Sequence, residues 1–172
     1  MKKVIIGAVT AVLLGVGAGA ALAANSDKAT GGIGSPGAAA NGNVPFNLEF
    51  TAQNSASPSG TFQFRRADGS FKVASVSCYS QSGNEAGFSG IITSTSGIFA
   101  DPTNASYVAP GSTGYAAVQD NGQGANSPPD MVQVDIGPQY ATNCAPGPFP
   151  YTVTSGNVLV HQGESQSRRS VG

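Results

Sequence analysis

The chain has 172 residues, with eight Lys and Arg, nine Asp and Glu, and one His, so its formal net charge is −1 at neutral pH. Charged residues make up only 10% of it, and no basic cluster is larger than a pair. Nucleic-acid binding needs clustered Lys and Arg to neutralise phosphates. We therefore do not expect nucleic acid as a partner.

The first 23 residues have the features of an export signal. Lys2-Lys3 gives a positive start, an apolar run follows from Val4, and Ala21-Leu22-Ala23 is typical of a cleavage site. The alternative is a retained membrane anchor, but the run is rich in Gly and Ala and ends at a clean cleavage site. We expect a signal peptide over 1–23, a secreted or extracellular protein, and no membrane association after cleavage. No Cys follows the run, which argues against a lipid anchor.

Two cysteines, Cys78 and Cys144, remain after the signal. In an exported protein an isolated pair is most simply a disulfide, and two free thiols are the alternative. Closing so long a loop stabilises a fold by about 4 kcal/mol in the chain-entropy treatment. Two Cys and one His are too few for a zinc site.

Composition changes along the rest of the chain and predicts its organisation. Residues 24–43 are mostly Ala, Asn, Ser and Gly, and so little apolar surface does not offset the entropy lost on ordering. We expect a flexible leader over 24–43, one folded domain over 44–162 and a polar tail over 163–172.

Short strand patterns separated by turns dominate residues 44–162. Phe46, Leu48 and Phe50, for example, alternate with polar residues. No window has sustained helical periodicity, and Gly, Pro, Ser and Asn, which are poor helix formers, are abundant. The pattern predicts an all-β fold: an antiparallel β-sandwich of about 7–9 short strands, with a small β-barrel as the alternative.

Asp68-Gly69 lies between two short apolar runs, which is a strong signal for a β-hairpin. A two-residue loop places Phe64 opposite Val73 and gathers the apolar side chains of both runs on one face. A three-residue loop instead places Phe64 opposite Lys72. The apolar pattern favours the two-residue loop.

The apolar positions change face after Val73, because the next ones are Val76 and Cys78. This predicts either a β-bulge near Ala74-Ser75 or a strand that is covered on both sides.

His161 is the only histidine, so a Ser-His-acid triad would have to use it. It lies at the end of a predicted strand beside the polar tail, and no G-x-S-x-G motif is present. We favour an exposed histidine at a strand terminus and predict no catalytic residue.

Paired carboxylates can hydrolyse glycosides, and the candidates are Glu49, Glu85, Asp120, Asp130 and Asp135. Glu49 and Asp135 alternate with apolar residues, which is typical of solvent-facing strand positions. The chain also has no Trp on which a sugar could stack. We therefore do not favour a glycosidase.

The stretch beginning at Asp120 and Asn121 resembles the start of a calcium loop, and Asp130 could join it if the loop folds back. However, Gly122 and Met131 occupy positions where an EF-hand has Asp and Glu. Asp-Asn-Gly is also an ordinary turn. We favour the turn, keep Asp120, Asn121 and Asp130 as a possible ligand or metal loop, and predict no metal and no cofactor.

Several segments in a fixed order resemble a group of small, uncharacterised secreted β proteins of actinobacteria and related bacteria. They are Gly60-Thr61-Phe62-Gln63-Phe64, Val76-Ser77-Cys78, Gly83-Asn84-Glu85-Ala86, Val118-Gln119-Asp120-Asn121-Gly122, Pro129-Asp130, Cys144 and Gly156-Asn157-Val158-Leu159-Val160. The resemblance covers roughly residues 60–160. It implies a bacterial protein with a compact β domain and a Cys78–Cys144 bridge, and it implies no activity.

These observations lead to one functional hypothesis and two alternatives. We expect an extracellular, non-catalytic binding or structural module whose partner is a cell-envelope component, a surface partner or another copy of itself. The alternatives are a secreted hydrolase that uses Asp120, Asp130 or His161, and a calcium-stabilised β module.

Overall fold

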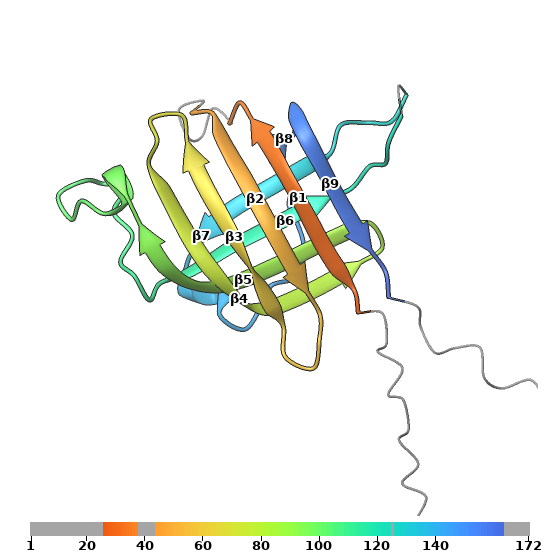
Figure 1. Cartoon of the computed structure of the whole chain (residues 1–172), viewed down its shortest axis with the longest axis horizontal. Coiled ribbons are helices and arrows are strands. Elements are labelled where there is room, and N and C mark those ends of the chain that lie inside the picture. Colours follow the sequence, from red (N-terminus) through yellow and green to blue (C-terminus); the bar gives the residue numbers. More distant parts are fainter. Residues whose placement is uncertain (1–25, 38–43, 125, 164–172) are drawn as a thin grey trace, which may run out of the picture.

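A computed structural model of the chain describes residues 26–37, 44–124 and 126–163 (Figure 1). The predicted signal peptide, and the predicted tail apart from Gly163, lie outside the described residues. No helix in the described part has the length and apolarity needed to cross a membrane.

Nine strands and two short 3-10 helices make up the described secondary structure. In chain order they are β1 (Lys28–Ser35), β2 (Phe46–Gln53), β3 (Ser59–Arg66), β4 (Phe71–Ser82), β5 (Glu85–Thr95), η2 (Gly97–Phe99), β6 (Thr113–Gln119), β7 (Met131–Ile136), η3 (Pro138–Tyr140), β8 (Tyr151–Thr152) and β9 (Ser155–His161).

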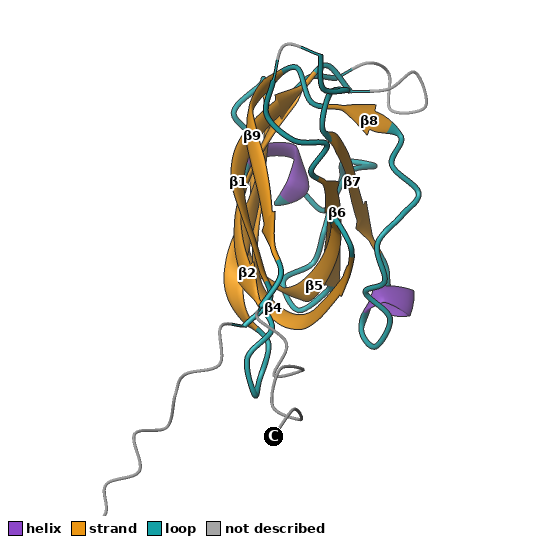
Figure 2. Ribbon diagram, turned by 90° about the vertical axis from the view of Figure 1, so that its right-hand side faces the viewer, coloured by secondary structure: helices purple, strands orange, loops and turns teal. Residues whose placement is uncertain are grey.

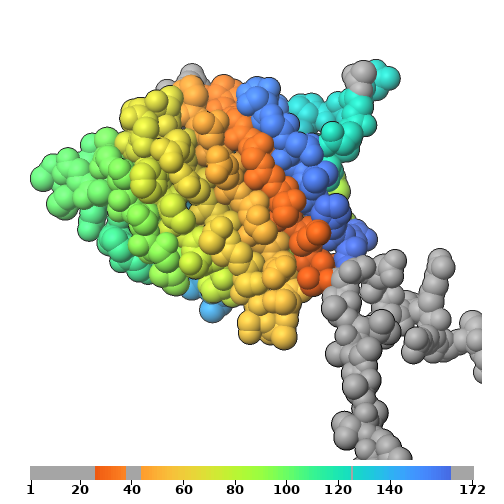
Figure 3. All heavy atoms as spheres, viewed as in Figure 1, coloured from red at the N-terminus to blue at the C-terminus, as the bar shows by residue number. Residues whose placement is uncertain are grey.

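All nine strands belong to one antiparallel sheet with the order β8-β7-β6-β5-β4-β3-β2-β1-β9. The strands β3, β2, β1 and β9 lie side by side across one face of the molecule (Figure 3). The sheet curls so that this half faces β5, β6 and β7 across the interior (Figure 2). The predicted all-β antiparallel fold is thus confirmed as a curled half-barrel, while the preference for a sandwich over a barrel stays a prediction.

The core fills the space between the two halves of the sheet, and the strict alternation of β2 supplies much of it. Phe46, Leu48 and Phe50 are buried, whereas the residues between them are exposed. The Phe50 ring stacks on Phe88 of β5 with 5.3 Å between centroids. Phe62 of β3 meets the same Phe88 ring edge-on at 5.5 Å. Aromatic contacts therefore join the two halves directly.

The flexible leader predicted over 24–43 is wrong for residues 28–35, which form β1. This strand pairs with β2 on one side and β9 on the other, so it lies inside the sheet. Gly31 fits because its neighbours leave no room for a side chain: a Cβ there would stand 2.6 Å from Phe50 Cζ and 2.5 Å from the Asn157 carbonyl oxygen. The apolar surface that the segment itself lacks is provided by its partners, so the domain begins well before residue 44.

The two-residue hairpin loop predicted at Asp68-Gly69 is also wrong, because the structure has a three-residue loop over 67–69. Arg66 N donates to Ser70 O at 2.9 Å, and Phe64 pairs with Lys72 rather than Val73. Gly69, at φ 85°, takes the left-handed position that such loops need. The apolar pattern misled because Phe71 lies on the outer face, where the Arg65 guanidinium covers its ring at 5.1 Å.

A register shift lies near the predicted bulge, but its extra residue, Thr93, belongs to β5, and the extra residue of β4 comes later, at Ser77. The β4–β5 register shifts between Val73 and Ala74 and again between Val76 and Cys78. The second shift adds Ser77 to β4, so Tyr79 returns to the core while Cys78 turns to the opposite face. That opposite face is covered by the loop after β7.

The predicted disulfide is confirmed: Cys78 and Cys144 are bonded. It fastens the loop between β7 and β8 to the outer face of the sheet, where Tyr115, Ala117 and Cys144 form a small second core. Tyr115 OH donates to the Ala145 carbonyl at 2.7 Å, and its ring stacks on Tyr140 at 4.2 Å.

Adjacent glycines in β1 test its place in the sheet. We expect Gly31→Ala to lower the free energy of unfolding by about 1–3 kcal/mol, the usual cost of overpacking, because the added methyl group meets Phe50 and Asn157. Gly32→Ala is the matched control, since its Cβ would meet nothing within 4 Å. Urea unfolding of both variants measures the difference, and equal stabilities would contradict the placement of β1.

Candidate functional site

The loop between β6 and β7 brings Asp120, Asn121 and Asp130 together, as the sequence suggested. Asn121 N donates to Asp130 Oδ1 at 2.8 Å, and Asn121 Nδ2 donates to the Pro129 carbonyl at 2.7 Å. Gly122 N donates to Asp120 Oδ1 at 2.9 Å, which is the Asx-turn expected of Asp-Asn-Gly.

The remaining carboxylate oxygens of this loop bind the edge of the sheet. Val158 N donates to Asp130 Oδ2 at 3.2 Å, and Val160 N donates to Asp120 Oδ2 at 3.1 Å. Both donors belong to β9, whose other side pairs with β1. An edge strand otherwise presents unpaired N–H groups. The two carboxylates therefore act as side-chain partners for an open strand edge.

This arrangement occupies all four oxygens of Asp120 and Asp130 with backbone donors. No group of three or more His, Cys, Asp or Glu suited to holding a metal ion occurs in the part of the chain that the structure describes. His161 is exposed at the end of β9, opposite Lys28 of β1. The pocket that Asp130 lines contains neither Asp120 nor His161.

A second site, which the sequence reasoning missed, lies between β2, β3 and β4 on one side and β7 on the other. This aromatic pocket has a volume of about 320 Å³. It is lined by Val44, Phe46, Phe64, Arg66, Lys72, Phe99, Ser106, Val134, Asp135 and Ile136.

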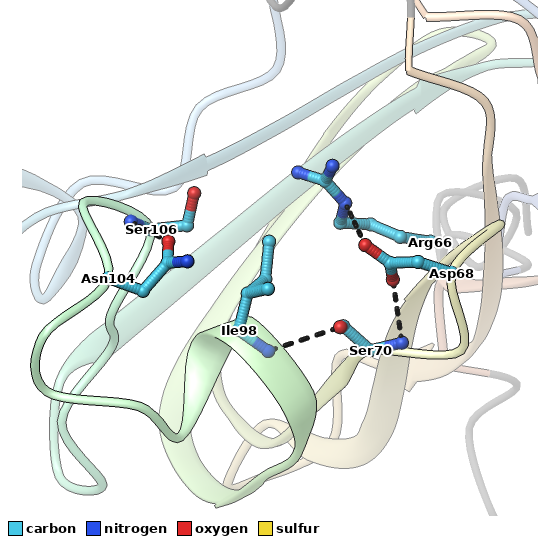
Figure 4. A network of polar contacts seen from close by, with 6 residues as sticks. All are labelled: Arg66, Asp68, Ser70, Ile98, Asn104 and Ser106. Carbon is cyan, nitrogen blue, oxygen red and sulfur yellow. Dashed lines mark hydrogen bonds and ion pairs between the residues drawn. The ribbon is translucent and has the colours of Figure 1, made fainter.

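The segment after β5 forms one wall of the aromatic pocket. Phe99 of η2 is buried and meets Phe64 edge-on at 5.9 Å. Ile98 N donates to Ser70 Oγ at 3.2 Å, which attaches η2 to the β3–β4 turn (Figure 4). Gly97 is required there, since a Cβ would stand 2.2 Å from Ser70 Oγ at a φ of 62°.

The β3–β4 turn also holds the first of two cationic side chains in the lining. Arg66 Nε lies 3.3 Å from Asp68 Oδ2, and Ser70 N donates to Asp68 Oδ1 at 2.8 Å (Figure 4). The hydrogen bond from the Ser70 backbone is the largest influence that lowers the pKa of Asp68. The Asp68 carboxylate thus fixes Arg66 at the pocket wall.

The second cation, Lys72, lies against aromatic rings inside the curl. Its Nζ is 4.7 Å from the centroid of Phe64 and 5.2 Å from that of Phe99, which are cation–π distances. Burial lowers the pKa of Lys72 to about 8, against a smaller opposing effect of the Asp135 charge. Lys72 is therefore still mainly protonated at neutral pH.

The acid in the lining, Asp135, is bonded elsewhere. Its Oδ1 accepts from Ile136 N at 2.8 Å and its Oδ2 from Tyr140 OH at 2.6 Å. Asp68 forms an ion pair with Arg66, and within the described residues no carboxylate forms one with Lys72. The aromatic pocket therefore combines apolar walls with an unpaired positive charge.

The sequence pattern pointed away from this site. Phe64 opposite Lys72 is the register of the three-residue loop, which the apolar pattern disfavoured. A lysine between Phe71 and Val73 is typical of a solvent-facing position, and only the pairing shows that it faces inward.

Scans against protein-family models, curated proteins and solved structures found no match for this chain. Its function must therefore be inferred from its own residues.

The contacts of Asp130 predict a structural role that can be measured. In Asp130→Asn one of the two backbone N–H groups would face an amide NH₂ instead of an acceptor. We expect a loss of about 1–3 kcal/mol in unfolding free energy and faster hydrogen exchange at Val158 N.

The control for this variant is Asp101→Asn, because the Asp101 carboxylate accepts its hydrogen bonds from Thr103 within an exposed turn. Its stability should change by less than about 0.5 kcal/mol. Unchanged exchange at Val158 in Asp130→Asn would show that the carboxylate does not support β9.

Proposed function

We propose that this protein is an exported, non-catalytic module that binds a small ligand with an apolar body in the aromatic pocket. The observation that carries the proposal is the lining itself. Small-molecule sites are typically concave, about 300–1,000 Å³ in volume, and apolar with a few placed polar groups. The aromatic pocket, at about 320 Å³, has Phe46, Phe64 and Phe99 among its walls and Lys72 among its polar groups.

The chemistry of the lining favours binding over hydrolysis. A hydrolase needs a nucleophile or activated water beside a base that is free to take a proton. The lining contains no His, and both oxygens of its acid, Asp135, accept hydrogen bonds from the protein. The hydrolase and calcium alternatives receive no comparable support, since the oxygens of Asp120 and Asp130 bind backbone amides.

Export is supported by the disulfide and by the signal-like start of the sequence. A disulfide persists in oxidising compartments and is rare in the reducing cytosol, and Cys78 and Cys144 are bonded here. An exported protein is in the same compartment as the cell envelope, so a small molecule of the envelope is an accessible ligand. The resemblance to secreted bacterial proteins fits the same location.

Binding can be tested with a neutral aromatic probe, 2-naphthamide, titrated into the mature protein and followed by amide NMR shifts. We expect the shifted resonances to cluster around the aromatic pocket. Ser106→Trp should abolish binding, because Ser106 lines the pocket and a large side chain there would fill it.

Ala105→Trp is the matched control, since Ala105 is exposed and outside the lining, and it should bind as the wild type does. Shifts scattered over the surface, or equal binding by both Trp variants, would refute the proposal.

A further inference from the structure

We infer that the ligand of the aromatic pocket is an organic anion, with one carboxylate on a flat aromatic or short apolar body, and that Lys72 is the group that binds the carboxylate. This inference rests on the proposed function and specifies its ligand class.

The charges in the lining support an anion. Arg66 and Lys72 are both positively charged. Asp68 forms an ion pair with Arg66 but not with Lys72. Asp135 is the one acid of the lining, and its carboxylate is held by Ile136 N and Tyr140 OH. Asp135 therefore acts on Lys72 through its charge, but within the described residues no carboxylate lies within ion-pair distance of the Lys72 ammonium group.

The surroundings of Lys72 leave its ammonium group short of partners. Phe64 and Phe99 provide ring faces to its Nζ, and no carboxylate in the described residues forms an ion pair with it. A partly buried ammonium is costly unless it is paired and hydrogen-bonded. A ligand carboxylate would supply both the charge and the acceptors.

The aromatic walls limit what the carboxylate can be attached to. Phe46 and Phe64 stack at 4.9 Å, and Phe99 meets Phe64 edge-on. Such rings pack well against a flat or apolar body. Val134 and Ile136 continue this apolar wall on β7. Anion and apolar body are thus recognised by neighbouring parts of one pocket.

Binding should also depend on pH in a defined direction. The titratable or charged groups in the lining beside Lys72 are Arg66 on β3 and Asp135 on β7. Lys72 loses its proton as the pH rises through about 8. The affinity for a carboxylate should therefore fall from neutral to alkaline pH.

The test compares 2-naphthoate with 2-naphthamide, which share size and shape but differ in charge, by NMR titration. At pH 7 we expect the wild type to bind 2-naphthoate about tenfold more tightly, since hydrogen bonds to charged groups contribute that much. Lys72→Met should remove this preference, so that the variant binds 2-naphthoate no more tightly than 2-naphthamide. Lys28→Met, at an exposed position that begins β1, should keep the preference.

A second readout uses only the wild type: 2-naphthoate affinity should fall between about pH 7 and pH 10, whereas 2-naphthamide affinity should stay constant. Equal affinities for the two probes, with no dependence on pH or on Lys72, would overturn the inference and leave the proposed function standing. Failure of both probes to bind would overturn both.

Discussion

The three-residue turn over 67–69 is the constraint on which the rest of this structure depends. It sets the register between β3 and β4, and through the two-residue period of a strand it decides which side chains of β4 face inward. Lys72, Ala74 and Val76 then lie on the inner side, and one extra residue at Ser77 sends Tyr79 inward and Cys78 outward. The interior pocket follows from the β3–β4 register, and the exterior disulfide follows from that register together with the extra residue Ser77.

The curled sheet leaves an edge at β9, and the protein satisfies that edge with side chains instead of another strand. Asp120 and Asp130 come from the loop that joins β6 to β7, on the opposite half of the sheet. Their bonds to Val158 and Val160 hold the two halves together where no backbone ladder does. Polar residues that look like ligands in the sequence are therefore used to close the fold.

Much of the fold could be predicted from sequence, for reasons that are local. The alternation of β2, the turns and the spacing of the two cysteines depend on neighbouring residues and on composition. β1 could not be found this way, because what favours it is its pairing with β2 and β9 and close contacts from distant residues, such as that of the Phe50 ring with Gly31. The predicted hairpin register was wrong for a similar reason. The sequence pattern places Phe71 in the core, whereas in the structure it lies on the outer face, covered by Arg65.

For the candidate sites, too, the sequence predicted what depends on neighbouring residues and missed what depends on distant strands. The sequence correctly grouped Asp120, Asn121 and Asp130, since a short loop joins them, but their role depends on the distant strand β9. The aromatic pocket was missed because its lining comes from β2, β3, β4, η2 and β7, which only the curl of the sheet brings together. Lys72 occupies a position that is typical of a solvent-facing residue, so the sequence did not predict its inward orientation.

The inward orientation of Lys72 is the central claim, and nuclear Overhauser effects on the labelled protein test it most directly. The account predicts cross-peaks from the Lys72 side-chain methylenes to the ring protons of Phe64 and Phe99, with upfield ring-current shifts of those methylenes. Cross-peaks from Val73 to the core rings, together with solvent-like shifts for Lys72, would establish the two-residue hairpin register and contradict the account.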